Sequence, residues 1–310
     1  MKEKQTSMHR TTGTAMLTGS VGRKILPYKP TAAKPLILSA SELREFIDCR
    51  VKWNWRYNAR LESLGGSKPL SIGSLTHNGL DLYYQTPFKR RKERTMMRIA
   101  AKLVKDTTLK ALDVADKELV EAMLNGYSRW SLQEDPKIGL QNCFPEEEFE
   151  LPLVKDGSII IRGKLDNRFI PTVLRRVMAL SEFKTAKQFQ IEKIDLDVQL
   201  SVYLWALRKK FPGYRRYIAY YNVLRKQMPT DRVTAPLFYR EEVERSDDEI
   251  EQWVRDTRRI AKDIVGAAIY PNPGDRCGWA CDFKNACMLR GSPADVAHVL
   301  KTEYSVREKH

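Results

Sequence analysis

The spacing of apolar residues changes from a helical period to a strand period near residue 147, which limits the folds open to the chain. Phe149, Leu151 and Leu153 alternate with polar residues, residues 155–158 read Lys-Asp-Gly-Ser, and isoleucines occupy 159–161. Such alternation puts every second side chain on one face of a strand, and a polar, Gly-containing run between two strands is typical of a turn. We therefore expect a β-hairpin. Further strands are expected near 176–184, 214–224 and 233–240.

Apolar residues before this point recur at helical spacing. Ser39-Ala40-Ser41-Glu42 has the form of a capping box, and apolar residues at 43, 46, 47 and 51 follow on one helix face. A second helix is expected over 73–84 and carries His77. Further helices are expected near 92–112, 116–132, 193–210 and 246–268. The pattern predicts an α/β fold, with a mixed central β-sheet flanked by helices and a mostly helical N-terminal half.

Composition divides the chain into three segments. Residues 1–35 are rich in Thr, Ser, Lys and Gly with little periodicity, so we expect a flexible basic arm. Residues 36–290 are long enough for a single domain with a sizeable core. Its expected parts are a mostly helical part (36–145), a sheet core (146–245) and a helix followed by clustered cysteines (246–290). Residues 291–310 are expected to form a C-terminal tail.

The chain is basic, with 54 Lys and Arg against 39 Asp and Glu and a net charge of +15. An excess spread along the chain favours a polyanionic partner, although a soluble protein can also simply be basic. The Lys-Arg-Arg-Lys-Glu-Arg run at 89–94 either follows a phosphate backbone or forms a solvated face. No segment approaches the roughly 20 apolar residues of a membrane-spanning helix, and no secretory signal is evident. We expect a cytoplasmic protein without a membrane partner, with organelle targeting by the arm as the alternative.

Glu182-Phe183-Lys184 lies in an expected strand, where residues two apart point to the same face. Asp166 follows Gly163, which permits a close backbone approach, and a carboxylate on a neighbouring strand can converge on Glu182. Carboxylate oxygens suit Mg²⁺ or Mn²⁺, and a lysine beside such an ion can orient water and stabilise charge on a phosphate. The alternative is a surface Glu-Lys pair with Asp166 in a turn.

These residues resemble the PD-(D/E)xK nuclease superfamily, specifically its RecB-like and CRISPR-associated exonuclease branch with an iron-sulfur cluster. The resemblance spans about residues 39–290 and implies a restriction-endonuclease-like core. His77 resembles the family's metal-binding histidine, Gly163-Lys164-Leu165-Asp166 its G-x-x-D motif, and Glu182-Phe183-Lys184 its E-x-K motif. Gln199 and Tyr203 resemble its Q-x-x-x-Y motif. Taken singly, His77 and Tyr203 are also compatible with ordinary core positions.

The resemblance implies roles for these residues. His77, Asp166, Glu182 and the carbonyl of Phe183 would bind Mg²⁺ or Mn²⁺. Lys184 would act in catalysis together with Asp166 and Glu182, and the catalytic set would include Gln199 and Tyr203.

Three cysteines, Cys277, Cys281 and Cys287, lie within eleven residues, a spacing that indicates a metal centre in a reducing compartment. The resemblance implies that Cys49 is the fourth ligand and that the four thiolates hold a 4Fe-4S cluster. Zinc is the competing occupant, because four thiolates satisfy it equally well. Cys143 is expected to remain a free thiol.

Two functions remain open on these observations. The first is a metal-dependent exonuclease that hydrolyses DNA from its ends in recombination, repair, or phage or CRISPR-related DNA processing. The second is a catalytically silent DNA-binding module with a structural metal cluster. Trp53, Trp55 and Tyr57 either stack bases of single-stranded DNA or belong to the core. No P-loop of the G-x-x-x-x-G-K-[ST] kind occurs, so unwinding would require a helicase or recombination partner.

Overall fold

The computed structural model describes residues 29–64, 68–105, 112–188, 191–233, 236–266 and 269–307. The chain forms two compact units. The sheet unit contains residues 37–40 and 67–255, and the cysteine unit contains 41–66 and the chain from 256 onward. Most of the arm expected over 1–35 lies outside the described residues, as do parts of the segments expected at 92–112, 233–240 and 246–268.

The sheet unit is built on a six-stranded mixed sheet with the order β1-β4-β5-β6-β7, in which β3 also pairs with β4. The strands are β1 (Leu36–Leu38), β3 (Cys143–Pro152), β4 (Ile159–Phe169), β5 (Val177–Ala186), β6 (Arg216–Arg225) and β7 (Phe238–Val243). The expected hairpin is confirmed, because β3 and β4 are antiparallel neighbours. The pair β5–β6 is parallel, and both β4–β5 and β6–β7 are antiparallel.

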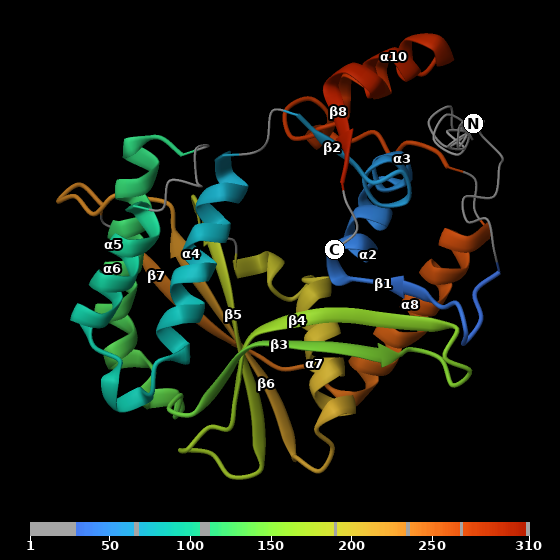
Figure 1. Cartoon of the computed structure of the whole chain (residues 1–310). Helices are drawn as coiled ribbons and strands as arrows, with labels where there is room; N and C mark the ends of the chain where they lie inside the picture. Colours follow the sequence, from blue (N-terminus) through green and yellow to red (C-terminus); the bar gives the residue numbers. More distant parts are fainter. Residues whose placement is uncertain are drawn as a thin grey trace, which may run out of the picture. The chain divides into compact units, whose positions relative to one another are not determined.

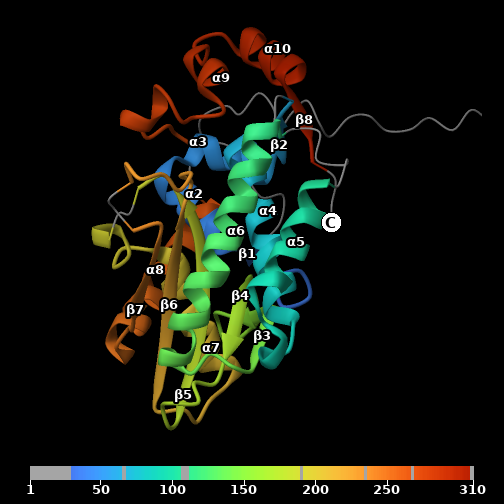
Figure 2. The ribbon, with the colours of Figure 1, turned by 90° about the vertical axis from the view of Figure 1, so that its left-hand side faces the viewer.

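Helices α4, α5 and α6 lie side by side along one face of this sheet (Figures 1 and 2). The helices of the unit are α4 (Lys68–Gln85), α5 (Glu93–Lys105), α6 (Val114–Glu134) and α7 (Val198–Lys210), with short 3-10 turns η2 (Phe88–Arg90), η3 (Pro136–Ile138) and η4 (Ile191–Lys193). Helix α7 lies in the crossover between the parallel strands β5 and β6, which cannot be joined by a tight turn.

Alternation along β5 decides what each of its side chains meets. Val177, Ala179 and Phe183 join the buried core formed with α4, α5 and α6. Glu182 and Lys184 point to the opposite face, where Lys184 reaches α7. One strand therefore supplies both core residues and polar residues beside a helix.

The cysteine unit has its own hydrophobic core. Its elements are α2 (Ala40–Asp48), α3 (Arg50–Trp53), the π-helical η1 (Asn54–Asn58), β2 (Leu61–Ser63), η5 (Asp275–Cys277), α9 (Lys284–Met288), α10 (Pro293–Glu303) and β8 (Tyr304–Val306). Phe283 stacks on Tyr304 with 4.9 Å between ring centroids and contacts Trp55. Helix α8 (Asp247–Gly266) has its first residues in the sheet unit and its later ones in the cysteine unit.

Two segments differ from the sequence-based expectation. Residues 291–310, expected as a tail, contain α10 and β8, and β8 pairs antiparallel with β2 some 240 residues earlier in the chain. Three residues are too few to show the alternation that predicts a strand. The partner strand β2, distant in the sequence, supplies the pairing. The helix expected over 193–210 begins only at Val198, because Asp197 caps it by accepting a hydrogen bond from the Gln199 N–H at 2.7 Å.

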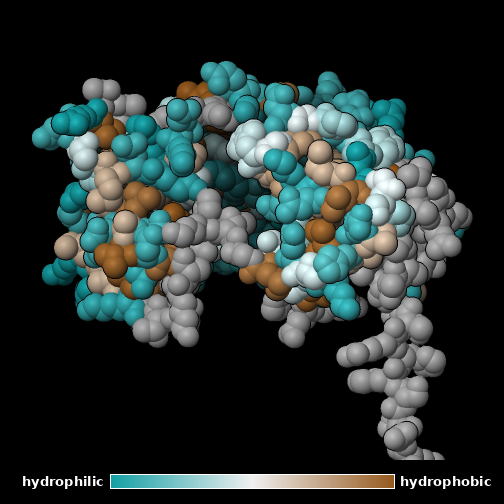
Figure 3. Space-filling model, turned by 90° about the horizontal axis from the view of Figure 1, so that it is seen from above, coloured by the Kyte–Doolittle hydropathy of each residue, from teal (hydrophilic) through white to brown (hydrophobic). Residues whose placement is uncertain are grey.

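The described helices include none that is both long and apolar enough to cross a membrane. Hydrophilic side chains dominate the face seen in Figure 3, in keeping with a chain in which 30% of residues are charged.

Candidate active site

Strand β5 places Glu182 and Lys184 on the same face, as the sequence predicted. Glu182 is almost fully buried, with 1% of its surface exposed. The Lys184 ammonium group donates to Glu182 Oε1 and also to Gln199 Oε1, the latter at 2.7 Å. The lysine therefore links the buried carboxylate on β5 to helix α7.

Asp166 on β4 lies against the same segment of β5. The backbone N–H of Phe183 donates to Asp166 Oδ2 at 2.8 Å. His77 on α4 approaches the same oxygen, with 3.5 Å between Nδ1 and Oδ2. Gly163, three residues before Asp166, makes room for the Phe149 ring, since a Cβ atom at this position would lie 2.5 Å from that ring. The close backbone approach expected of this glycine is thus made to a side chain of β3.

Helix α7 contributes Gln199 and Tyr203, which lie one helical turn apart on one face. The Gln199 amide donates to the Tyr203 hydroxyl at 2.7 Å, while its oxygen accepts from Lys184. Tyr203 is also a core residue, because it is buried and meets the Phe149 ring edge to face. Both sequence-based readings of Tyr203 therefore describe part of its environment.

The carboxyl groups of the site have opposite pKa shifts. Burial, followed by repulsion from Asp166, raises the pKa of Glu182 to about 8, against the opposing effect of Lys184. Burial also opposes ionisation of Asp166, but the hydrogen bond and charge of His77 hold its pKa below the usual value. Burial disfavours the charged form of Lys184, but Glu182 and Asp166 raise its pKa overall. The site therefore combines an Asp166 that ionises readily, a buried Glu182 that resists ionisation and a lysine that remains cationic.

The carboxylates leave coordination capacity unused. Glu182 Oε2 is buried and has no hydrogen-bond partner among the described residues. An adjoining pocket of about 10 Å³, roughly the room that one water-sized sphere needs, is lined by His77, Leu80, Asp81, Tyr84, Glu146, Asp166 and Phe183. Within the described ranges, no three His, Cys, Asp or Glu side chains converge closely enough to form a ready ligand set. The donor types and the orphaned oxygen nevertheless fit a hard divalent cation.

Sequence reasoning missed Asp81 and Glu146, which line this pocket. Asp81 follows His77 by one helical turn, so the spacing could have revealed it. Glu146 lies opposite Asp166 and has a left-handed backbone, with φ of 54°, which costs energy for a residue other than glycine. Three consecutive glutamates at 146–148 carry no signal that distinguishes this one.

The four cysteines at 49, 277, 281 and 287 line one pocket of about 820 Å³ in the cysteine unit. All are free thiols, and burial raises the pKa of both Cys281 and Cys287. Cys49 comes from the junction of α2 and α3, whereas the other three come from η5, α9 and the turn between them. The fold thus gathers thiols from both ends of the sequence, although they do not form a ready ligand set as they stand. Cys143 is also free, and Arg91 donates to its sulfur at 2.8 Å.

Two surface interpretations need correction. Trp53 and Trp55 are buried, with 2% and 5% of their surface exposed, so they cannot stack the bases of a DNA strand. Trp53 meets Phe46 edge to face, and Trp55 packs on Phe283, which is the core alternative. In the basic run at 89–94, Arg91 is buried and donates to backbone carbonyls of residues 84 and 86, so it is not a phosphate contact.

Comparisons with known proteins agree with the motifs. The family model for the PD-(D/E)XK nuclease superfamily matches residues 37–288. A solved structure of a candidate exonuclease from Eubacterium rectale is 13% identical, with 91% of this chain and 93% of that chain covered and a TM-score of 0.48. The structure of SSO0001 is 16% identical, with 80% and 83% covered and a TM-score of 0.36. No curated protein sequence gives a significant match.

Similarities at these TM-scores carry no weight for the fold or the activity, whereas the family match covers the whole of the motif-bearing region. On that match, the chain belongs to the PD-(D/E)XK nuclease superfamily.

Proposed function

We propose that this protein is a Mg²⁺- or Mn²⁺-dependent deoxyribonuclease that hydrolyses phosphodiester bonds from DNA ends. The observation that carries the proposal is the buried Glu182 carboxylate, of which one oxygen meets Lys184 and the other has no hydrogen-bond partner among the described residues. A buried carboxylate oxygen without a partner is costly, and a bound cation would offset that cost. The +15 net charge favours a polyanionic substrate such as DNA.

His77, Asp166, Glu182 and the carbonyl of Phe183 would hold the cation. When bound, the ion supplies a Lewis acid that neutralises phosphate charge and lowers the pKa of a coordinated water. Lys184 would orient the attacking water and stabilise negative charge developing on the phosphate. Gln199 holds the Lys184 ammonium in place at 2.7 Å, and Tyr203 in turn holds the Gln199 amide.

The cysteine unit would carry a 4Fe-4S cluster on Cys49, Cys277, Cys281 and Cys287, which would place the chain in the RecB-like branch. All four thiols line one pocket, so either zinc or a cluster would find its ligands there. The spacing of one remote cysteine and three close ones favours the iron-sulfur cluster. Because Cys49 and Cys287 are 238 residues apart in sequence (287 minus 49), the cluster would close a long loop and contribute to folding free energy.

A catalytically silent DNA-binding module is the alternative. The clustering of Asp166 and Glu182 argues against it, because unneutralised carboxylates repel phosphate and would weaken binding. The motifs' resemblance to a largely exonucleolytic branch favours DNA ends as the substrate. Recombination, repair, or phage or CRISPR-related processing would be the setting, with a helicase or recombination protein as partner.

End-labelled DNA tests the proposal. Linear and circular forms, single- and double-stranded, are incubated with the protein and Mg²⁺, Mn²⁺ or EDTA. We expect loss of label from linear DNA only with a divalent ion, and no cleavage by Glu182→Ala. Binding without cleavage under every condition would support the silent module, and cleavage of circular DNA would overturn the end-dependent activity.

A further inference from the structure

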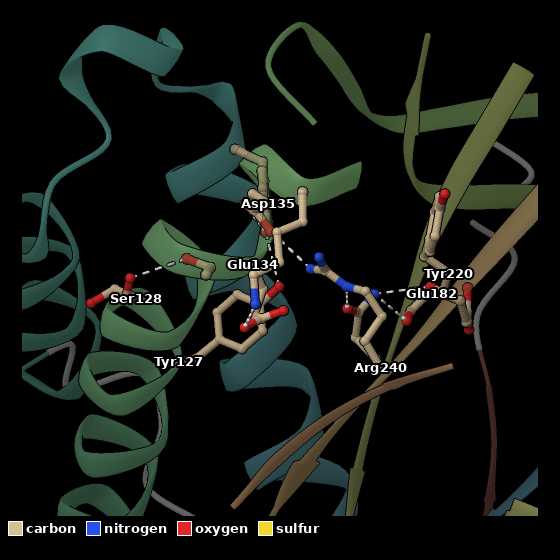
Figure 4. Close-up of polar contacts among 11 residues, drawn as sticks. Tyr127, Ser128, Glu134, Asp135, Glu182, Tyr220 and Arg240 are labelled. Atoms are coloured by element: carbon tan, nitrogen blue, oxygen red, sulfur yellow. Dashed lines mark hydrogen bonds and ion pairs between the residues drawn. The ribbon is translucent and has the colours of Figure 1, made fainter. Parts of the chain in front are cut away.

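Arg240 on β7 lies outside the proposed ligand set and has a largely buried side chain. Its Nη2 donates to Asp135 Oδ1 at 2.8 Å, and the two side chains are only 8% and 5% exposed. Its Nε donates to Asn222 Oδ1 on β6 at 2.6 Å. Figure 4 shows Arg240 extended between Asp135, at the end of α6, and the strands that carry Glu182 and Tyr220. Arg240 thus connects a helix to the centre of the sheet.

Asn222 carries the connection to β5. It is fully buried, and in the parallel register it lies opposite Phe183. Its side-chain NH₂ donates to the carbonyl of Glu182 at 3.2 Å and to that of Tyr220 at 2.9 Å. Because the Arg240 N–H can only donate, it requires the oxygen of the Asn222 amide on its side and thereby directs the NH₂ group toward β5. Arg240 therefore determines which way this amide points.

Asp135 also contacts the residue that packs on the opposite, core-facing side of this β5 segment. The Phe183 ring stacks on Tyr84, with 5.6 Å between centroids and 24° between planes. The Tyr84 hydroxyl donates to Asp135 Oδ2 at 2.9 Å and lies 2.8 Å from the Tyr127 hydroxyl. The backbone at Glu182 and the side chain of Phe183 are thus both held by groups that end on one buried carboxylate.

Stability alone is a poor explanation for this arrangement. Burying an ion pair costs desolvation energy, and well-packed apolar residues of similar volume often stabilise a protein equally well or better. None of these groups belongs to the proposed ligand set, but Asn222 contacts the backbone and Tyr84 the ring of the segment that would supply two ligands. Such outer contacts orient metal ligands and tune affinity in other metalloproteins.

We propose that Arg240 is a positioning residue, which acts through Asn222 to hold the Glu182–Phe183 segment of β5 in the geometry required to bind the divalent ion. This inference rests on the proposed function and extends it to residues outside the proposed ligand set. Asp135 and Tyr84 complete the positioning set from the helical side of the sheet.

Mn²⁺ binding to the DNA-free protein tests the inference, measured by calorimetry on variants shown to be folded by circular dichroism. Asn222→Asp retains an acceptor for Arg240 but loses the donor to the Glu182 carbonyl. Arg240→Lys retains a positive charge for Asp135, but it lacks the planar guanidinium that donates to Asp135 and to Asn222 at the same time. We expect each to weaken Mn²⁺ binding by about 10- to 100-fold. Excess Mn²⁺ should restore part of the cleavage rate, which a general loss of stability would not allow.

Matched controls separate positioning from folding. Arg216→Lys alters two exposed ion pairs of β6, one with Glu242 on β7 and one with Glu244 just after β7. This variant should bind Mn²⁺ like the wild type. If Arg240→Lys or Asn222→Asp unfolds the protein, Tyr84→Phe tests the inference instead. This variant keeps the ring that stacks on Phe183 and loses only the hydroxyl that donates to Asp135. It should weaken Mn²⁺ binding measurably.

The outcomes distinguish this inference from the function on which it rests. Wild-type protein that binds no Mn²⁺, or Glu182→Ala protein that still cleaves DNA, would overturn both. Wild-type protein that binds Mn²⁺ through Glu182, with folded positioning variants that bind it equally tightly, would overturn the inference alone.

Discussion

Gln199 on α7 accepts a hydrogen bond of 2.7 Å from the Lys184 ammonium on β5, so the orientation of the lysine is set by a helix that follows it in sequence. The same amide donates to Tyr203, which leaves it little freedom to turn away from Lys184. These hydrogen bonds connect the Glu182-Phe183-Lys184 motif on β5 with Gln199 and Tyr203 on α7.

Replacing Gln199 with Leu should lower the single-turnover rate of DNA cleavage by up to about 100-fold, because a misplaced catalytic group loses productive orientation. Metal binding should change little, since the carboxylates are untouched. Gln227→Leu, at an exposed position, is the control and should cleave normally. An unchanged rate in Gln199→Leu would show that Lys184 needs no support from α7.

The carboxylates and the lysine should fail differently. Asp166→Ala or Glu182→Ala should weaken metal binding, whereas DNA affinity without metal should hold or rise because repulsion of phosphate is relieved. Lys184→Ala should retain most metal binding and lower the cleavage rate by about 10²–10³, the effect of losing one charge-stabilising group. Calorimetric metal titration and single-turnover cleavage on the three variants measure this. Wild-type cleavage by all three would place the active site elsewhere.

On the proposed cluster, protein purified without oxygen should be brown and contain iron, and Cys49→Ser should lose both because it removes one of the four thiols that line the pocket. The solubility of this variant should fall as well, since binding of the proposed cluster would contribute to the free energy of folding. Cys143→Ser is the matched control and should retain iron, since Cys143 lies in the sheet unit beside Arg91. Stoichiometric zinc without iron or sulfide in the wild type would contradict the cluster assignment.

Glu147→Gln should reduce stability in a pH-dependent manner. Burial opposes ionisation of Glu147, but Lys210 and Arg168 outweigh it and hold its pKa below 4.5, the ordinary value. A pKa lower in the folded than in the unfolded state adds stability above pH 4.5, which is lost as pH falls through the folded-state pKa. The free energy of unfolding should therefore drop by about 1 kcal/mol or less at pH 7, because solvent screens the partly exposed pair.

The difference between Glu147→Gln and wild type should shrink as pH falls below 4.5. Urea unfolding at several pH values measures it, with Glu148→Gln at the exposed neighbouring position as the control. A deficit that stayed constant down to the acid limit would show that lost packing, not lost charge, explains the effect.

Local patterning was sufficient to predict much of the sheet unit. The β3–β4 hairpin and the strand that carries Glu182 and Lys184 are visible in the sequence because alternation along a strand is a local property. The positions of Asp166 and His77 were predicted only as members of ordered motifs. Asp166 meets the Glu182 segment because β4 and β5 are neighbours, and His77 meets Asp166 because α4 packs on β4; no local pattern specifies either arrangement.

Long-range packing decided the rest. Trp53 and Trp55 looked equally suited to DNA and to a core, but both are buried. For Trp55 the ring partner is Phe283, more than 200 residues later in the chain. Arg240 and Asp135 have no sequence signature as a pair because they are 105 residues apart, and only the docking of α6 on the sheet brings them within 2.8 Å. Sequence by itself determined which residues could do the chemistry, since residue type and local period are written there. The tertiary structure decided which of them meet and what holds them, because contacts between distant segments depend on how whole elements pack.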